Sequence, residues 1–238
     1  MTTVLEPDAV DALVEALWAR GFRVLGPTVR DGAIVYDELH AADELPIGWT
    51  EVQEAGTYQL VRRVDHALFG YAVGPHSWKQ FLFPPRVSLW NARRRNGGFE
   101  VEETERDDGP LALVGVRACE LHAIETQDRV FLQGRYSDAD YAARRRDLFV
   151  VAVNCVEPGG TCFCASMGTG PEVEVGYDLA MTEILDGGHR FLVETGSERG
   201  AEVLAELPRR DANGADLVAA RRAVAEAQLD GLRALGGA

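Results

Sequence analysis

The sequence predicts an α/β fold: a mixed sheet with a parallel βαβ unit, flanked by helices. Two largely apolar stretches, at residues 111–116 and 147–155, have the length and composition of strands buried on both faces. Residues 119–132 and 137–147, which lie between these runs, have the apolar spacing of helices. The order strand, helices, strand is typical of parallel strands joined by a crossover.

The first half of the chain, residues 1–108, predicts one helix followed by short strands. Apolar residues recur at helical spacing over residues 8–21, which end on a glycine. Short runs punctuated by Gly and Pro predict strands, at residues 22–27, 32–39, 57–64 and 68–75. Residues 77–98 predict a short helix, a break at two prolines and a second helix. An acidic polar loop at residues 100–110 then divides the chain into halves.

The second half, residues 109–210, contains the βαβ unit and all four cysteines. The helix at residues 137–147 is expected to be capped by Ser137 or Asp138. We therefore interpret residues 1–210 as one α/β domain that carries the site, and residues 211–238 as a C-terminal helix.

Composition and charge exclude several classes of function. The net charge is -14, with 38 acidic and 24 basic residues, so the phosphate backbone of a nucleic acid would be repelled at long range. No apolar run approaches the roughly 18 residues of a membrane span. The first residues lack the basic and apolar segments of a secretory signal, so we expect a cytoplasmic location.

Cysteine placement is the most informative feature of the sequence. Cys155, Cys162 and Cys164 lie within ten positions, and Cys119 lies 36 residues before Cys155. Cys119 and Cys155 each follow one of the two strands of the βαβ unit. Because parallel strands joined by a crossover end at the same edge of a sheet, we expect all four thiols to converge there.

The chemistry of such a site stays open from spacing alone. Four thiolates fit an iron–sulfur cluster or a Cys₄ zinc site, and redox-active or plain structural thiols are further alternatives. The Cys162-x-Cys164 pair is too tight for the usual zinc knuckle. His122 has the spacing to join a zinc site, although a helix position favours packing or solvent exposure.

Three further features bear on the site. Cys119 is expected at a helix N-terminus, where free N–H groups and the helix dipole lower the pKa of a thiol. Arg117 would add a positive charge beside a thiolate-rich cofactor. Lys79 is the only lysine among the 24 basic residues, and we place it near the cofactor together with Arg117.

Two motifs resemble a known family of redox proteins. The stretches GVRACELHAIETQDRVF (residues 115–131) and NCVEPGGTCFCASMGTGP (residues 154–171) are similar to the beta subunit of cytoplasmic sulfhydrogenases and to the corresponding iron–sulfur subunit of anaerobic sulfite reductase. Softer similarity extends through the first half, so the resemblance covers nearly the whole chain. Ala118 and Glu120 stand where the family has Pro and Asp, which leaves the cysteines in place.

The resemblance implies an iron–sulfur electron-transfer protein. It implies that one [4Fe–4S] cluster is held by four ligands, Cys119, Cys155, Cys162 and Cys164. It also implies partners, namely flavin- or hydrogenase-type subunits and a ferredoxin-like domain. Family members continue into such a domain, but no cysteine follows Cys164 here. The C-terminal helix is therefore either a linker toward an absent ferredoxin-like domain or the end of a naturally short relative.

The sequence contains no recognisable constellation for acid–base or nucleophilic catalysis. We therefore expect a non-catalytic electron-transfer component of a multi-subunit oxidoreductase of the hydrogenase or sulfite reductase type. Two alternatives from other classes are a zinc- or cluster-stabilised interaction module and a thiol-based enzyme that handles sulfur.

Overall fold

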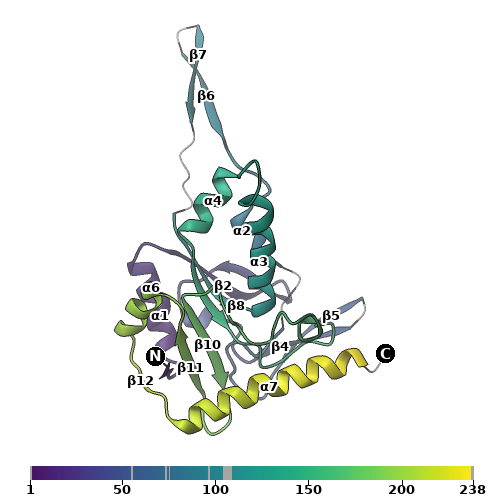
Figure 1. The fold of residues 1–238 in the computed structure, drawn as a ribbon. Coiled ribbons are helices and arrows are strands. Elements are labelled where there is room, and N and C mark those ends of the chain that lie inside the picture. The colour runs from purple at the N-terminus through teal and green to yellow at the C-terminus, as the bar shows by residue number, and fades with distance from the viewer. Residues whose placement is uncertain are drawn as a thin grey trace.

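A large mixed sheet forms the centre of the molecule (Figure 1). The computed structural model describes residues 2–54, 56–72, 74, 76–95, 97–103 and 109–236. Within these residues the main sheet has eight strands, in the order β12-β1-β11-β10-β9-β8-β2-β3. The strands are β1 (Thr2–Leu5), β2 (Arg23–Arg30), β3 (Ala33–Glu38), β8 (Leu111–Val116), β9 (Phe149–Val153), β10 (Leu179–Ile184), β11 (Arg190–Thr195) and β12 (Arg210–Asp211). The predicted fold class is confirmed.

Four adjacent strands of the sheet, β10, β9, β8 and β2, are parallel. β2 pairs with β8, β8 with β9, and β9 with β10 in parallel, whereas the outer strands join antiparallel. Every residue of β8, β9 and β10 is buried. This burial explains the continuous apolar runs, because a parallel strand between two helical layers has no polar face.

Helices cover both faces of the sheet (Figure 1). On one face, α1 (Ala9–Ala19) and α6 (Glu198–Glu206) pack into the same apolar cluster as alternate residues of β8 and β9. On the other face, α2 (Lys79–Leu82), α3 (Ala118–Phe131) and α4 (Ala139–Arg146) pack against the remaining residues of these strands. Asp138 caps α4 by accepting a hydrogen bond from the Tyr141 N–H at 2.8 Å, as the sequence predicted.

The last long helix, α7 (Gly214–Gly236), runs across β10 and β11 and continues past the body of the sheet (Figure 1). It contacts the short helix α5 (Cys164–Met167) in the cysteine loop, where a Cβ added at Gly231 would lie 3.5 Å from Ala165 Cβ. No helix in the described residues combines the length and apolarity needed to cross a membrane.

Two hairpins lie outside the main sheet. β4 (Trp49–Glu54) and β5 (Thr57–Arg62) form one hairpin, and the other joins β6 (Trp90–Arg95) to β7 (Gly98–Glu103). The β6–β7 hairpin projects away from the body (Figure 1). The prediction of a second helix after the two prolines, within residues 77–98, is therefore wrong. Side chains of β6 and β7 alternate between the two faces of the hairpin. Gly97, at φ +85°, permits the tight turn between the two strands.

The prediction of a strand at residues 68–75 is also wrong, because the described residues of this stretch form no strand. The backbone N–H groups of Leu68 and Phe69 donate to the Glu183 carboxylate, and the Ala72 N–H donates to Glu51. These donors are thus bound to side chains rather than to a neighbouring strand. The acidic loop predicted at residues 100–110 begins within β7, and its residues 104–108 lie outside the described part of the chain.

A β-bulge at Gly115 interrupts β8 just before the cysteine site. The pairing register between β8 and β9 shifts between Val114 and Val116, and Gly115 has φ +89°. A Cβ at Gly115 would lie 3.1 Å from Phe69 Cε1 and 3.3 Å from Pro27 Cδ. Glycine is required here both for its backbone conformation and for the close approach of two side chains.

We predict that Gly115→Ala lowers the free energy of unfolding more than the control Gly21→Ala. Both glycines have positive φ, so both variants incur a backbone strain of about 1–3 kcal/mol. Only Gly115 has neighbours within 4 Å of the added Cβ, so only this variant adds a packing clash. Chemical denaturation of both variants measures the difference, and equal losses would contradict the assignment.

Candidate metal centre

All four cysteines of the chain line one pocket. It lies at the carboxyl ends of β8 and β9, where the parallel pairing was expected to bring the thiols together. The residues that line the pocket are Ala72, Arg117, Ala118, Cys119, Cys155, Cys162, Cys164 and Pro171. Each cysteine is partly buried, and none is in a disulfide.

The first wall of the pocket is the junction between β8 and α3. Arg117 is the N-cap of α3, and Cys119 lies in the first helical turn. The Glu120 carboxylate accepts a hydrogen bond from the Arg117 N–H at 2.9 Å and another from the Tyr36 hydroxyl at 2.5 Å. These bonds fix the start of the helix, so the position of the Cys119 side chain is set by buried contacts.

The second wall is the loop that leaves β9. The Cys155 N–H donates to Pro171 O at 3.1 Å, which closes the loop on itself. The Cys162 N–H donates to Gly159 O at 3.0 Å, and Cys164 begins α5. The loop therefore presents three thiols from a backbone that is held by its own hydrogen bonds.

Two glycines keep the space beside the sulfurs open. A Cβ at Gly159 would lie 3.0 Å from Ala72 Cβ and 3.7 Å from Cys162 Sγ. A Cβ at Gly170 would lie 3.5 Å from Cys164 Sγ, and its φ of +152° is a conformation that L side chains rarely adopt. Larger residues at either position would occupy space next to a thiol.

Arg117 places a positive charge in this wall. Its side chain is almost fully buried, and its guanidinium donates to three backbone carbonyls, those of Phe69, Tyr71 and Asn154. The guanidinium also lies 5.1 Å from the centre of the Tyr71 ring. Arg117 was predicted to lie beside the cysteine site, and the structure places it in the lining of the thiol pocket.

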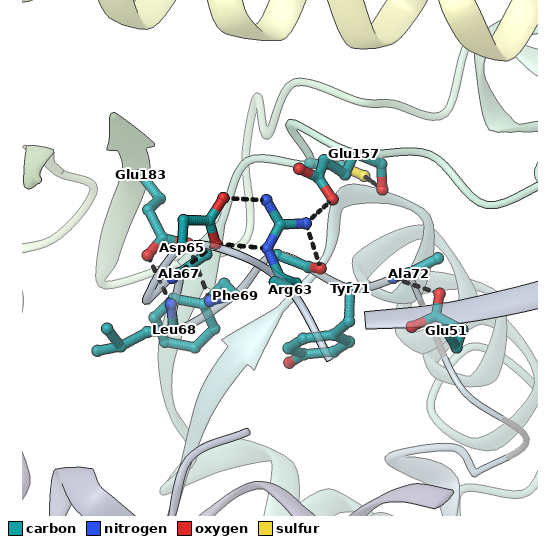
Figure 2. Close-up of polar contacts among 12 residues, drawn as sticks. Glu51, Arg63, Asp65, Ala67, Leu68, Phe69, Tyr71, Ala72, Glu157 and Glu183 are labelled. Atoms are coloured by element: carbon teal, nitrogen blue, oxygen red, sulfur yellow. Dashed lines mark hydrogen bonds and ion pairs between the residues drawn. The ribbon is translucent and has the colours of Figure 1, made fainter. Parts of the chain in front are cut away.

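Figure 2 shows the polar contacts of the segment at residues 65–72, whose last residue, Ala72, lines the thiol pocket. Glu183 on β10 accepts hydrogen bonds from Leu68 N–H at 2.7 Å and Phe69 N–H at 2.8 Å. Arg63 binds Asp65 and the Gly70 carbonyl.

Two contacts tie the cysteine loop to the first half of the chain. Arg63 forms an ion pair with Glu157, which follows Cys155 by two positions. Thr161 donates from its hydroxyl to Gln53 Oε1 of the β4–β5 hairpin at 2.9 Å. The first half of the chain thus holds the cysteine loop in place.

Sequence patterns did not indicate Glu51, Arg63, Glu157 or Glu183. Glu183 is almost fully buried, on a strand whose other residues are also buried. Glu183 lies in the mostly apolar stretch LAMTEI, residues 179–184. A carboxylate in such a stretch was the available signal, because charged residues are rarely buried without partners. Arg63 and Glu157 carried no comparable signal, since both belong to polar stretches of the sequence.

The predicted lowering of the Cys119 pKa is wrong. Burial first, and then the Glu120 carboxylate and the other thiols, raise the pKa of Cys119 to about 12. Burial also raises the pKa of Cys155, against the opposing effect of Arg117, and it raises the pKa of Cys162 and Cys164. Desolvation of the thiolate outweighs the helix N-terminus, so without a metal these thiols stay protonated at neutral pH.

Lys79 and His122 do not line the thiol pocket. Lys79 is exposed at the start of α2, and its ammonium lies 6.0 Å from the centre of the Phe83 ring. His122 is exposed on α3, with Nδ1 3.5 Å from Glu125. The structure therefore brings Arg117 and the four cysteines together and leaves these two residues apart from them.

The donor set, four thiols around one pocket, fits a thiolate-bound metal group. A mononuclear Cys₄ zinc site, with Zn–S bonds of about 2.3 Å, draws its sulfurs to within about 3.8 Å of one another. Among the described residues, no group of three or more His, Cys, Asp or Glu is arranged to hold a metal ion. Four thiolates can bind either one zinc ion or the separate iron atoms of a cluster.

We predict that the metal-free folded protein reacts slowly with iodoacetamide at Cys119. At pH 8 the rate should be on the order of a thousandfold below that of the unfolded chain, whose thiols have ordinary pKa values. Because burial raises the folded pKa, the rate should keep rising with pH beyond pH 10. Peptide mass spectrometry over a pH series measures it, and a plateau near pH 9 would contradict the raised pKa.

Comparison with known proteins supports the resemblance seen in the motifs. No family model matches the chain. The chain is 30% identical, over 185 residues, to the sulfhydrogenase 2 subunit beta of Pyrococcus furiosus. The alignment covers 77% of this chain and 45% of the relative, so the chain spans less than half of the relative's length. The similarity to a sulfhydrogenase beta subunit, first inferred from two cysteine motifs, is thereby confirmed.

Proposed function

We propose that this chain is an electron-transfer part of a multi-subunit oxidoreductase and holds one [4Fe–4S] cluster. The proposed ligands are Cys119, Cys155, Cys162 and Cys164. The observation that carries the proposal is that four cysteines from two separate segments line one pocket at the ends of parallel strands. The similarity to a sulfhydrogenase beta subunit supports the same interpretation.

The protein's own residues prepare the pocket for such a group. The four thiols lose their protons on binding iron, and ligation offsets the desolvation that raises their pKa in the metal-free state. Ala72, Ala118 and Pro171 contribute apolar lining, which limits contact with water. When bound, the cluster supplies one-electron redox chemistry at a potential set by burial, charge and hydrogen bonding.

The thiol-based enzyme is the weaker alternative. A reactive cysteine needs a lowered pKa so that the thiolate is present at neutral pH. Burial raises the pKa of all four thiols here. Ligation by a metal group, which displaces the protons, is consistent with that environment.

The proposed partners are the other subunits of a hydrogenase- or sulfite-reductase-type complex. Single electrons would pass between the cluster and such partners, namely flavin- or hydrogenase-type subunits and a ferredoxin-like domain. We place the complex in the cytoplasm. The relative is named as one subunit of sulfhydrogenase 2, and this supports a role within an assembly.

We predict that anaerobically purified protein contains about four iron and four sulfide per chain, as a cubane requires. It should be brown and should bleach with dithionite, and the reduced protein should give an electron paramagnetic resonance signal. Iron, sulfide and zinc analyses together with visible spectra measure this. Stoichiometric zinc in a colourless protein would refute the cluster and favour a structural zinc module.

We predict that Cys119→Ser loses iron as completely as Cys162→Ser. The two cysteines lie on different walls of the pocket, and a shared cluster needs both walls. His122→Ala is the matched control, because His122 is three positions from Cys119 but does not line the pocket. Full iron content in Cys119→Ser would contradict a single site with four ligands.

A further inference from the structure

Arg117 carries a buried charge that forms no hydrogen bond or ion pair with a carboxylate of the described residues. The residue is 2% exposed. Nη1 donates to Asn154 O at 3.1 Å, and Nη2 donates to Phe69 O at 2.6 Å and Tyr71 O at 3.0 Å. All three acceptors are neutral carbonyls, and Nε is buried without a partner. Among the ion pairs between described residues, none involves Arg117.

The carboxylates of Glu120 and Glu51 interact with the Arg117 charge through space, without a hydrogen bond to the guanidinium, and Glu51 Oε2 is buried without a partner in the described part of the chain. The two Glu120 carboxylate oxygens accept from the Arg117 backbone N–H and from the Tyr36 hydroxyl, and not from the guanidinium. Glu51 Oε1 accepts from the Ala72 N–H. The guanidinium is therefore held by carbonyl dipoles, and its full charge is not neutralised by a hydrogen-bonded carboxylate.

Two other poorly exposed arginines do have carboxylate partners. Arg63 pairs with Asp65 and Glu157, and Arg190 pairs with Asp216. Removing a charge from water without a counter-ion costs several kcal/mol per ion. Such a charge in a folded protein therefore indicates an anionic group nearby. The anion-forming side chains that share a pocket lining with Arg117 are the four thiols.

We propose that Arg117 is the internal counter-charge of the cluster and raises its reduction potential. This inference rests on the proposed function. Reduction moves one electron from a donor such as dithionite onto the cluster, so the site becomes more negative by one charge. A fixed guanidinium in a poorly solvated pocket stabilises the reduced site more than the oxidised site. Arg117 is a positioning residue in this sense, and it is not a ligand.

The guanidinium also links three backbone segments, so the test must separate charge from geometry. Arg117→Lys keeps the positive charge and loses the planar fork, whereas Arg117→Gln loses both. Arg190→Gln is the control, because Arg190 is also poorly exposed, but it pairs with Asp216 and does not line the pocket.

The experiment is a dithionite titration of the holoprotein, followed by electron paramagnetic resonance, with iron analysis of each variant. At the wild-type midpoint potential, the ratio of reduced to oxidised cluster should fall at least about tenfold in Arg117→Gln, which corresponds to about 59 mV for one electron. Arg117→Lys should recover most of that ratio, and Arg190→Gln should match the wild type.

Each outcome decides the proposal. Equal potentials in wild type and iron-loaded Arg117→Gln, or equal shifts in Arg117→Lys and Arg117→Gln, would overturn it and leave Arg117 as a backbone clamp. If Arg117→Gln binds no iron while Arg117→Lys does, the charge is needed for assembly, which supports the counter-charge. If neither variant binds iron, geometry dominates and the proposal is overturned. Wild-type protein without iron would instead refute the proposed function.

Discussion

The parallel pairing of β8 with β9 is the constraint from which the site follows. The two strands run side by side in register, with Ala112 opposite Phe149 and, beyond the bulge, Val116 opposite Ala152. Their carboxyl ends therefore lie at one edge of the sheet, and the residues that follow each strand become neighbours. The Arg117 guanidinium closes this junction by donating to Asn154 O, which directly follows β9. If another strand lay between β8 and β9, Cys119 would be separated from the three cysteines that follow β9 by at least the width of that strand.

Buried polar side chains at this edge bind backbone groups as well as one another. Glu183 accepts from two N–H groups of a segment 115 and 114 residues away in sequence. The Asn154 side chain donates to Thr182 Oγ1 and accepts from the Val173 N–H. Loops that lack a strand partner thus satisfy their donors through side chains from the sheet. Such loops are held in one conformation, and a site whose ligands come from loops needs that restriction.

The sequence predicted the elements whose signals are local. Continuous apolar runs indicated β8 and β9, and the helices between them indicated a crossover, which was sufficient to bring Cys119 to the cysteine loop. Residues 68–72 could not be predicted, because their conformation depends on Glu183, more than a hundred positions later. The Cys119 pKa was predicted from the helix terminus alone, whereas burial by distant segments sets its direction.

The same burial that raises the thiol pKa values also isolates the Arg117 charge, and the two effects are coupled. In the metal-free state the pocket contains neutral thiols beside a cation that has no hydrogen-bonded carboxylate, which is unfavourable in a poorly solvated site. Thiolates bound to iron would replace the neutral thiols by anions and so compensate the guanidinium. Assembly of the proposed cluster would then stabilise the edge of the sheet itself, including residues 69–71, whose carbonyls Arg117 holds. In the proposed cluster, the cysteine thiolates and the arginine would therefore form one electrostatic unit, in which each charge is costly to bury without the other.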